Sequence, residues 1–376
     1  MDTRTPIAAR RRLALLGAGA IATAGVVALA GCASPAASTS ADGPQIVATT
    51  TQVGDFTREL LGGDAGVTQL LSPGQSAHGF DPSAAQLLAL TNADALVVNG
   101  GGLESWLDDA IDASGFDGVL IDASTGIELF GTDDHAHDDD ADASGDDHDD
   151  DASHDEAADD HDHDHESGDD AAHDHADDHE GHDHGAGNPH IWTDPELAED
   201  MVENIADGLA TVEGIDAASV ESNEAAYLAK LEALDAWIEE NVEQVPAAER
   251  LLVTNHDAFT YFVDAYDVTF VGSIIPSFDD NAEPSAAEID DLVAKIESTG
   301  VEAVFSEASL SPKAAETIAA ESGVAVYSGP DALYGDSLGA AGTDGETYLG
   351  SQIHNARLIL ESWGVAPTAL PSALQG

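Results

Sequence analysis

Residues 45–71 read QIVATTTQVGDFTRELLGGDAGVTQLL. Two short apolar runs rich in β-branched residues, Ile46–Thr50 and Val67–Leu71, frame this stretch and are typical of buried strands. A helical pattern lies between them over Val53–Leu61. A strand, a helix and a second strand in this order predict a βαβ unit with parallel strands, covered by the helix.

The same alternation continues through the rest of the first half and starts again after Pro246. It predicts parallel sheets with helices on both faces. In the first half, the further strands are expected at Ala95–Asn99 and Val119–Asp122, and the helices at Pro82–Leu90 and Leu103–Ala113. In the second half, the strands are expected at Leu251–Thr254, Val268–Ile274, Ala303–Ser306 and Val324–Tyr327, and the helices at Ala258–Ala265, Ala286–Thr299, Pro312–Ser322 and Tyr348–Trp363.

Two further helices are expected before Pro246, at Pro195–Leu209 and Ala217–Glu243. In the second of them, Tyr227, Leu231, Leu234 and Ile238 recur at helical spacing. A helix of this length would extend about 40 Å and could cross a whole domain. We therefore predict an α/β protein with two (β/α)4-type lobes and parallel sheets, joined by one long rigid helix. The N-terminal lobe covers residues 45–216, the joining helix residues 217–243, and the C-terminal lobe residues 247–376.

The first 32 residues predict a lipoprotein signal peptide. Three arginines at 10–12 precede the apolar stretch Leu13–Leu29, and Leu29-Ala30-Gly31-Cys32 resembles a bacterial lipobox. Cys32 is the only cysteine and is the expected lipidation site, so no intramolecular disulfide can form. Residues 33–44 predict a flexible tether, and we expect an extracytoplasmic protein lipid-anchored to the cell membrane. The alternatives are a plain signal peptide or an N-terminal membrane anchor, and export by the Sec or the twin-arginine route stays open.

Residues 132–187 carry 12 of the 16 histidines and 25 acidic residues, but no lysine or arginine. This composition cannot bury enough apolar surface to fold, so a disordered loop inserted in the N-terminal lobe is predicted. Imidazole and carboxylate at this density can gather divalent transition metals. A solvated acidic loop is the alternative, although Asp and Glu alone would serve that purpose. The expected weak accessory ligands are His161, His163, His165, His173, His175, His179, His182 and His184.

The formal net charge of the chain is −64. Such a surface repels phosphates and anionic headgroups, so nucleic acid is excluded as a partner and the membrane is expected only through the lipid. The acidic surface attracts cations, and it is also typical of a saline habitat.

Outside the histidine-rich loop the chain has only four histidines: His78, His190, His256 and His354. Each of the first three lies at the end of a predicted strand or in the loop after it. In open α/β sheets, ligands bind at the carboxyl ends of the strands. A cleft between two lobes can bring such distant side chains together. His354 lies within the last predicted helix, where a surface or capping role is expected.

The sequence resembles the metal-binding lipoproteins of zinc and manganese ABC importers, the cluster A-I type of substrate-binding protein. The motifs that carry this resemblance are Asn188-Pro189-His190-Ile191-Trp192, His78 with Asp81-Pro82-Ser83, residues 334–339 and residues 347–349. The resemblance covers roughly residues 45–363. It implies two lobes joined by a rigid helix, a metal between them, and an ABC permease with its ATPase subunit as partners of a monomer.

The resemblance also implies the metal ligands, two from each lobe: His78 and His190, then His256 and Asp336. Three imidazoles and one carboxylate suit Zn²⁺, whereas Mn²⁺ prefers more oxygen and its family members typically carry Glu in place of His256. Zinc is therefore the favoured cargo and manganese the alternative. For the fourth ligand, Glu307 and Asp331 remain alternatives to Asp336, because Gly335-Asp336-Ser337 also has the composition of a plain turn.

We expect a high-affinity zinc-binding component of an ABC importer rather than an enzyme, with no catalytic residues. An exported zinc hydrolase is less favoured, because the sequence has no His-Glu-x-x-His motif and four protein ligands leave no open position for water. A surface protein that only buffers metal through the histidine-rich loop is a third interpretation. That loop is itself expected to raise the local metal concentration beside the site.

Deleting residues 132–187 from the mature protein should separate these interpretations. We expect several weak zinc sites to disappear and one tight site to remain, because the ordered ligands lie outside the deleted segment. Competitive titration of zinc and manganese into the intact and the shortened protein measures this. Loss of all tight binding would place the principal site in the loop instead.

Overall fold

The computed structural model describes residues 43–63, 66–130, 187–277 and 282–375. All of them belong to one compact unit, residues 41–376. The predicted signal peptide, the lipidation site Cys32, most of the tether and the accessory histidines lie outside the described residues. Within the described ranges, no helix combines the length and the apolar character needed to span a membrane.

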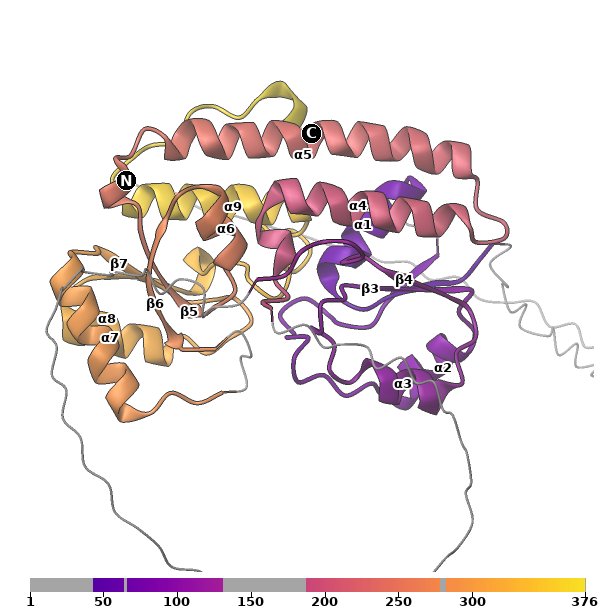
Figure 1. Ribbon diagram of the computed structural model, residues 1–376, viewed down its shortest axis with the longest axis horizontal. Helices are drawn as coiled ribbons and strands as arrows, with labels where there is room; N and C mark the ends of the chain where they lie inside the picture. The colour runs from indigo at the N-terminus through magenta and orange to yellow at the C-terminus, as the bar shows by residue number, and fades with distance from the viewer. Residues whose placement is uncertain (1–42, 64–65, 131–186, 278–281, 376) are drawn as a thin grey trace, which may run out of the picture. The chain divides into compact units, whose positions relative to one another are not determined.

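The N-terminal lobe is built on a four-stranded parallel sheet in the order β2-β1-β3-β4. The two central strands, β1 and β3, are buried along their whole length, which explains their continuous apolar sequence. Helices α1 and α4 pack on one face, while α2 and α3 pack together on the other (Figure 1). The strands are β1 (Ile46–Ala48), β2 (Val67–Gln69), β3 (Ala95–Val98) and β4 (Val119–Asp122), and the helices are α1 (Thr51–Leu61), α2 (Ala84–Thr91), α3 (Leu107–Ser114) and α4 (Pro195–Ala210).

The C-terminal lobe repeats the strand–helix alternation with two pairs of parallel strands, β5 with β6 and β7 with β8. Strands β5 and β7 lie side by side, but hydrogen-bonded ladders are formed only within each pair. At the end of β5 the amide of His256 donates to the side chain of Glu307 instead of a strand carbonyl. The strands are β5 (Leu251–His256), β6 (Thr269–Ile275), β7 (Ala303–Phe305) and β8 (Ala325–Tyr327), and the helices are α6 (Thr260–Ala265), α7 (Ala286–Thr299), α8 (Lys313–Ser322) and α9 (Tyr348–Ser362).

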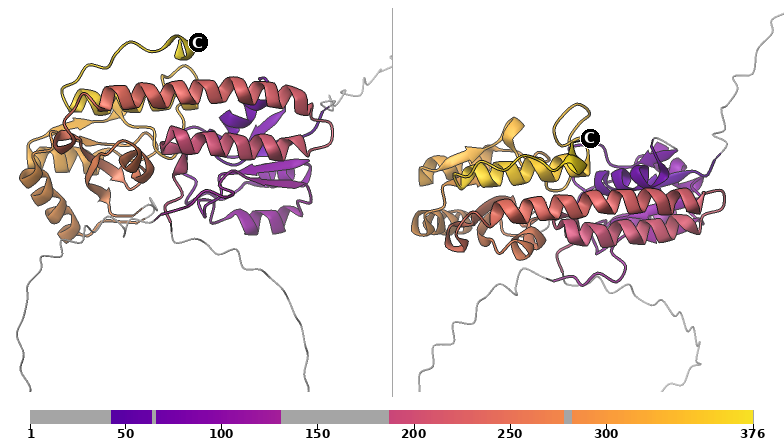
Figure 2. Two further views of the ribbon diagram at one scale, coloured as in Figure 1. Left: turned by 45° about the horizontal axis from the view of Figure 1, so that its top comes forward. Right: turned by 90° about the horizontal axis from the view of Figure 1, so that it is seen from above.

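Helix α5 (Ala217–Val242) joins the lobes and contacts elements of both. It packs on α4 and α1 of the N-terminal lobe and on α9 of the C-terminal lobe, as Figure 2 shows from two further directions. The predicted apolar stripe is confirmed, since Tyr227, Leu231, Leu234 and Ile238 are all buried. A continuous helix anchored along one face resists bending, so the lobes are held by a stiff connection.

The contact between α4 and α5 brings together many carboxylates. Glu199 on α4 is half-buried and lies near Glu232 and Asp235 of α5 and near Glu196 and Glu203 of its own helix. Burial first, and then repulsion by these four carboxylates, raises the pKa of Glu199 to about 7. The folded protein therefore holds a proton at this position over a pH range in which the unfolded chain has released it.

Replacing Glu199 by Gln should make the protein more heat-stable at pH 8 and leave it nearly unchanged at pH 5. Because the folded pKa is raised, the stability linked to this group is present at low pH and is lost as the pH rises toward 7. Glutamine keeps the uncharged form at every pH. Thermal unfolding at both pH values measures the effect, with Glu297→Gln on the exposed face of α7 as the control. Equal melting temperatures for wild type and Glu199→Gln at pH 8 would contradict this account.

Candidate metal centre

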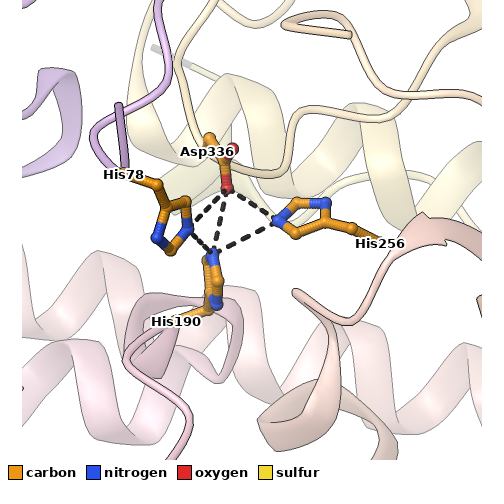
Figure 3. A group of neighbouring side chains, drawn as sticks. All are labelled: His78, His190, His256 and Asp336. Atoms are coloured by element: carbon orange, nitrogen blue, oxygen red, sulfur yellow. Dashed lines mark hydrogen bonds and ion pairs between the residues drawn. The ribbon is translucent and has the colours of Figure 1, made fainter. Parts of the chain in front are cut away.

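Four side chains converge between the lobes: His78, His190, His256 and Asp336 (Figure 3). Each offers one ligand atom, and these atoms lie within 4.8 Å of one another. Three of the residues are buried and His78 is partly exposed. These are the four positions that the family resemblance implies, and no other group of this kind occurs within the described ranges.

His78 lies in the loop that follows β2. The backbone of His78 is held at both its amide and its carbonyl. The amide donates to Oγ of Ser76 at 3.2 Å, and the carbonyl accepts from Oγ of Ser105 at 3.3 Å. The indole of Trp106 donates to the carbonyl of the preceding residue, Ala77, at 2.8 Å. The loop is thereby held to the start of α3, with the His78 ring turned toward His190, Nε2 to Nε2 at 3.1 Å.

His190 stands just before a 3-10 turn, Ile191–Thr193, that leads into α4. Its Nδ1 lies 2.7 Å from Oδ1 of Asn188, so the ring donates there and its Nε2 faces the centre. That Nε2 is 3.0 Å from Oδ1 of Asp336. Burial lowers the pKa of His190 to about 3, outweighing the attraction of Asp336, so the imidazole is neutral near pH 7 and able to coordinate a metal.

His256 is the last residue of β5, two residues beyond the predicted end of that strand. Its Nδ1 lies 2.8 Å from Oε1 of Glu307, and its Nε2 lies 3.0 Å from Oδ1 of Asp336. Burial alone would lower the pKa of His256, but the two carboxylates outweigh it and raise the pKa well above its usual value. A dication at the centre therefore has to displace a proton from this ring.

Asp336 enters the site from a loop that both lobes hold. The carbonyl of Gly335 accepts from Nε2 of Gln52 and from the indole of Trp192, each at 3.2 Å. A side chain at Gly335 would collide with Glu307, since an added Cβ would lie 2.1 Å from Oε2, so any other residue here would force the Glu307 carboxylate to move. Burial raises the pKa of Asp336, but His256 and His190 together lower it well below its usual range.

The other candidates for the fourth ligand take different places. Glu307 is fully buried but bonds the far nitrogen of His256, so it supports a ligand instead of facing the centre. Asp331 does not belong to the cluster. His354 lies in α9 with its Nε2 3.0 Å from the carbonyl of Ala332, which agrees with the expected structural role.

The chemistry of these four groups fits a divalent transition metal. Each of the two buried imidazoles has an acceptor at Nδ1, Asn188 for His190 and Glu307 for His256. Such partners fix the ring and direct the Nε2 lone pair toward a metal. Nothing in the sequence pattern indicated this role of Asn188, although the residue lies in the quoted motif, and the pattern offered Glu307 only as a possible ligand.

The sequence also matches known proteins. The family model for the periplasmic component A of the zinc-uptake complex matches residues 46–362. The chain belongs to this family. Its members are metal-binding, substrate-binding components of ABC importers and not enzymes, which places the chain in that class of transport protein.

Relatives of this protein carry names for two metals. The chain is 27% identical to the manganese-binding lipoprotein MntA of Halalkalibacterium halodurans, over 87% of this chain and 91% of that protein. It is 29% identical to the zinc-binding protein AdcA of Streptococcus pyogenes, over 85% of this chain but only 56% of AdcA. The chain thus spans about half the length of AdcA.

Solved structures confirm the predicted fold class. The periplasmic zinc-binding protein TroA of Treponema pallidum has a TM-score of 0.65 at 23% identity, over 85% of this chain and 99% of TroA. The manganese-bound periplasmic metal-binding protein of Candidatus Liberibacter asiaticus has a TM-score of 0.63 at 19% identity, with the same coverage. Both are similar to this chain in their two-lobed α/β fold.

Replacing Glu307 by Gln should weaken metal binding. Glutamine keeps an acceptor for Nδ1 of His256 but removes the charge that makes the ring basic, so we expect roughly a tenfold loss of zinc affinity. Competition with a chromophoric chelator measures it, and Glu316→Gln on the exposed surface of α8 is the matched control. Unchanged affinity in Glu307→Gln would show that the carboxylate does not act on the metal through His256.

Proposed function

We propose that this protein binds Zn²⁺ through His78, His190, His256 and Asp336 and delivers it to the permease of an ABC importer. The observation that carries the proposal is the convergence of three imidazole nitrogens and one carboxylate oxygen within 4.8 Å. Because His190, His256 and Asp336 are buried, a cation held there would lose most of its water to protein ligands. Four such ligands form the closed set typical of tetrahedral zinc.

The ligand types favour zinc over manganese. Imidazole suits zinc, whereas manganese is better served by carboxylate, carbonyl and water oxygen. The relative AdcA is named as a zinc-binding protein, which also supports zinc. With four protein ligands no position is left for a reactive water, which argues against the hydrolase alternative.

Manganese remains the second candidate, and two observations favour it. The relative MntA is named for manganese and is similar along most of its length. In addition, Oδ2 of Asp336 is buried without a hydrogen-bond partner among the described residues, so this carboxylate could offer a metal a second oxygen. A bidentate Asp336 would make the site richer in oxygen.

The rest of the transport role is part of the same proposal. The stiff helix α5 connects the lobes, so we expect loading to shift loops and lobes slightly without a wide hinge closure. A lipid at Cys32 would keep the monomer at the outer face of the cell membrane, beside the permease and its ATPase subunit. The histidine-rich residues 132–187 would gather zinc weakly near the site.

Replacing His190 by Ala tests the site directly. We expect His190→Ala to lose tight zinc binding, because a fully buried ligand is removed, while His354→Ala keeps it. Titration of zinc and of manganese, each in competition with a chelator, measures both affinities for the wild type and the two variants.

The order of the two affinities decides the metal. Zinc bound more tightly than manganese by the wild type supports the first proposal, and the reverse order supports the second. A wild-type level of binding in His190→Ala would contradict the proposed site for either metal.

A further inference from the structure

Asn188 links the ring of His190 to the C-terminal lobe. Its Oδ1 accepts from Nδ1 of His190 at 2.7 Å and from the backbone amide of His190 at 3.1 Å. Its Nδ2 donates to the carbonyl of Asp257 at 2.7 Å and to Oγ1 of Thr260 at 2.8 Å. Because Oδ1 faces two donors and Nδ2 faces two acceptors, the orientation of the Asn188 amide is fixed.

The backbone of Asn188 is held in the same way. Its carbonyl accepts from the hydroxyl of Tyr261 at 2.6 Å, and its amide donates to the carbonyl of Phe130 at 2.9 Å. Thr260 also bonds Oδ1 of Asp257 at 2.9 Å, so the segment Asp257–Tyr261 is tied together where it meets Asn188. This segment begins directly after the ligand His256.

The two buried imidazoles therefore differ in their support. His256 has its Nδ1 partner, Glu307, within its own lobe, and that partner is a carboxylate. The partner of His190 is a neutral amide whose other end is held by the opposite lobe. The orientation of His190 thus depends on how the lobes meet at this point.

We propose that Asn188 is a positioning residue through which the segment Asp257–Tyr261 sets the metal affinity of His190. The inference rests on the proposed function and adds to it a means of control. While the segment is in place, Asn188 keeps the proton of His190 on Nδ1 and the lone pair of Nε2 directed at the centre. If the segment moves away, Nδ2 of Asn188 loses both of its acceptors and the amide is held only through Oδ1, so the ring of His190 is oriented less firmly and the metal is held less tightly.

Replacing Thr260 by Val tests this link without touching a ligand. Valine has nearly the same shape but cannot accept from Nδ2 of Asn188. Loss of the outer-shell partner of a metal ligand, which here is Asn188, costs about 10–100-fold in affinity. Thr260 supports that partner and the carbonyl of Asp257 still holds the amide, so we expect a loss of no more than about tenfold. Thr317→Val on the exposed face of α8 is the matched control, since that hydroxyl donates to the carbonyl of Lys313 in its own helix.

A double-mutant cycle separates positioning from a general structural role. Zinc affinity is measured for the wild type, Thr260→Val, His190→Ala and the double variant, with the fold checked by thermal unfolding. If Thr260 acts through His190, its replacement weakens binding by up to about tenfold when His190 is present and has no further effect when it is absent. Equal losses in both backgrounds, or no loss in either, would overturn the proposal.

Hydrogen exchange offers a second test that does not depend on Thr260→Val being folded. The amide of Val263 donates to the carbonyl of Phe259 at 2.9 Å and reports on the first turn of α6. At saturating zinc, residues 257–263 should exchange more slowly in the wild type than in His190→Ala. Equal protection in both proteins would overturn the inference, whereas a wild type that binds no zinc at all would contradict the proposed function itself.

Discussion

One carboxylate oxygen, Oδ1 of Asp336, lies 3.0 Å from Nε2 of His190 and 3.0 Å from Nε2 of His256. The first histidine belongs to the N-terminal lobe and the other two residues to the C-terminal lobe, so this oxygen connects the halves of the molecule at its centre. Taking a charge out of water costs several kcal/mol, and here the cost is offset by the positive charge on His256 and by the hydrogen bond that its Nε2 donates. A bound dication would replace that proton and meet the same carboxylate.

The surrounding architecture keeps these groups in place. Gly335 lets the Asp336 loop pass close to Glu307, and Gln52 and Trp192 of the N-terminal lobe hold its carbonyl. The lobes are thus joined by polar contacts at the site, by the apolar face of α5, and by the contact of α1 with α9, where the rings of Phe56 and Tyr348 pack together. The polar contacts depend on the charge and the orientation of the side chains, whereas the apolar packing depends on neither. Loading can therefore alter the contacts around the site without changing the frame that carries them.

The sequence was sufficient for the order and type of the helices and strands, because their apolar periodicities are strong. It was less accurate at their ends. Helix α3 starts at Leu107 and not at Leu103, because the carboxylate of Glu104 turns back to accept from the amides of Asn99 and Gly100. Strand β5 extends to His256, whose amide finds a side-chain acceptor. Bonds of this kind depend on rotamers and loop paths, which periodicity does not encode.

The same limit applies to the candidate site. The four side chains that converge were implied by family motifs, and the small number of histidines outside residues 132–187 drew attention to three of them. Their supporting groups were not predicted. Glu307 was considered as a ligand because sequence cannot tell a carboxylate that faces a centre from one that faces the back of an imidazole. Asn188 could have been suspected from its place two residues before His190, but its contact with Thr260 joins positions 72 residues apart.

The hydrogen bond from the amide of Asn188 to the carbonyl of Phe130 has a consequence for how such proteins can diversify. It places the two ends of the intervening chain side by side, so the lobe is closed whatever length of sequence connects them. The entropic cost of closing a longer connection grows only slowly with its length. The anchoring of these two ends therefore does not depend on the length of the sequence between them. Related chains could share one ordered centre and still differ freely in the segment inserted here.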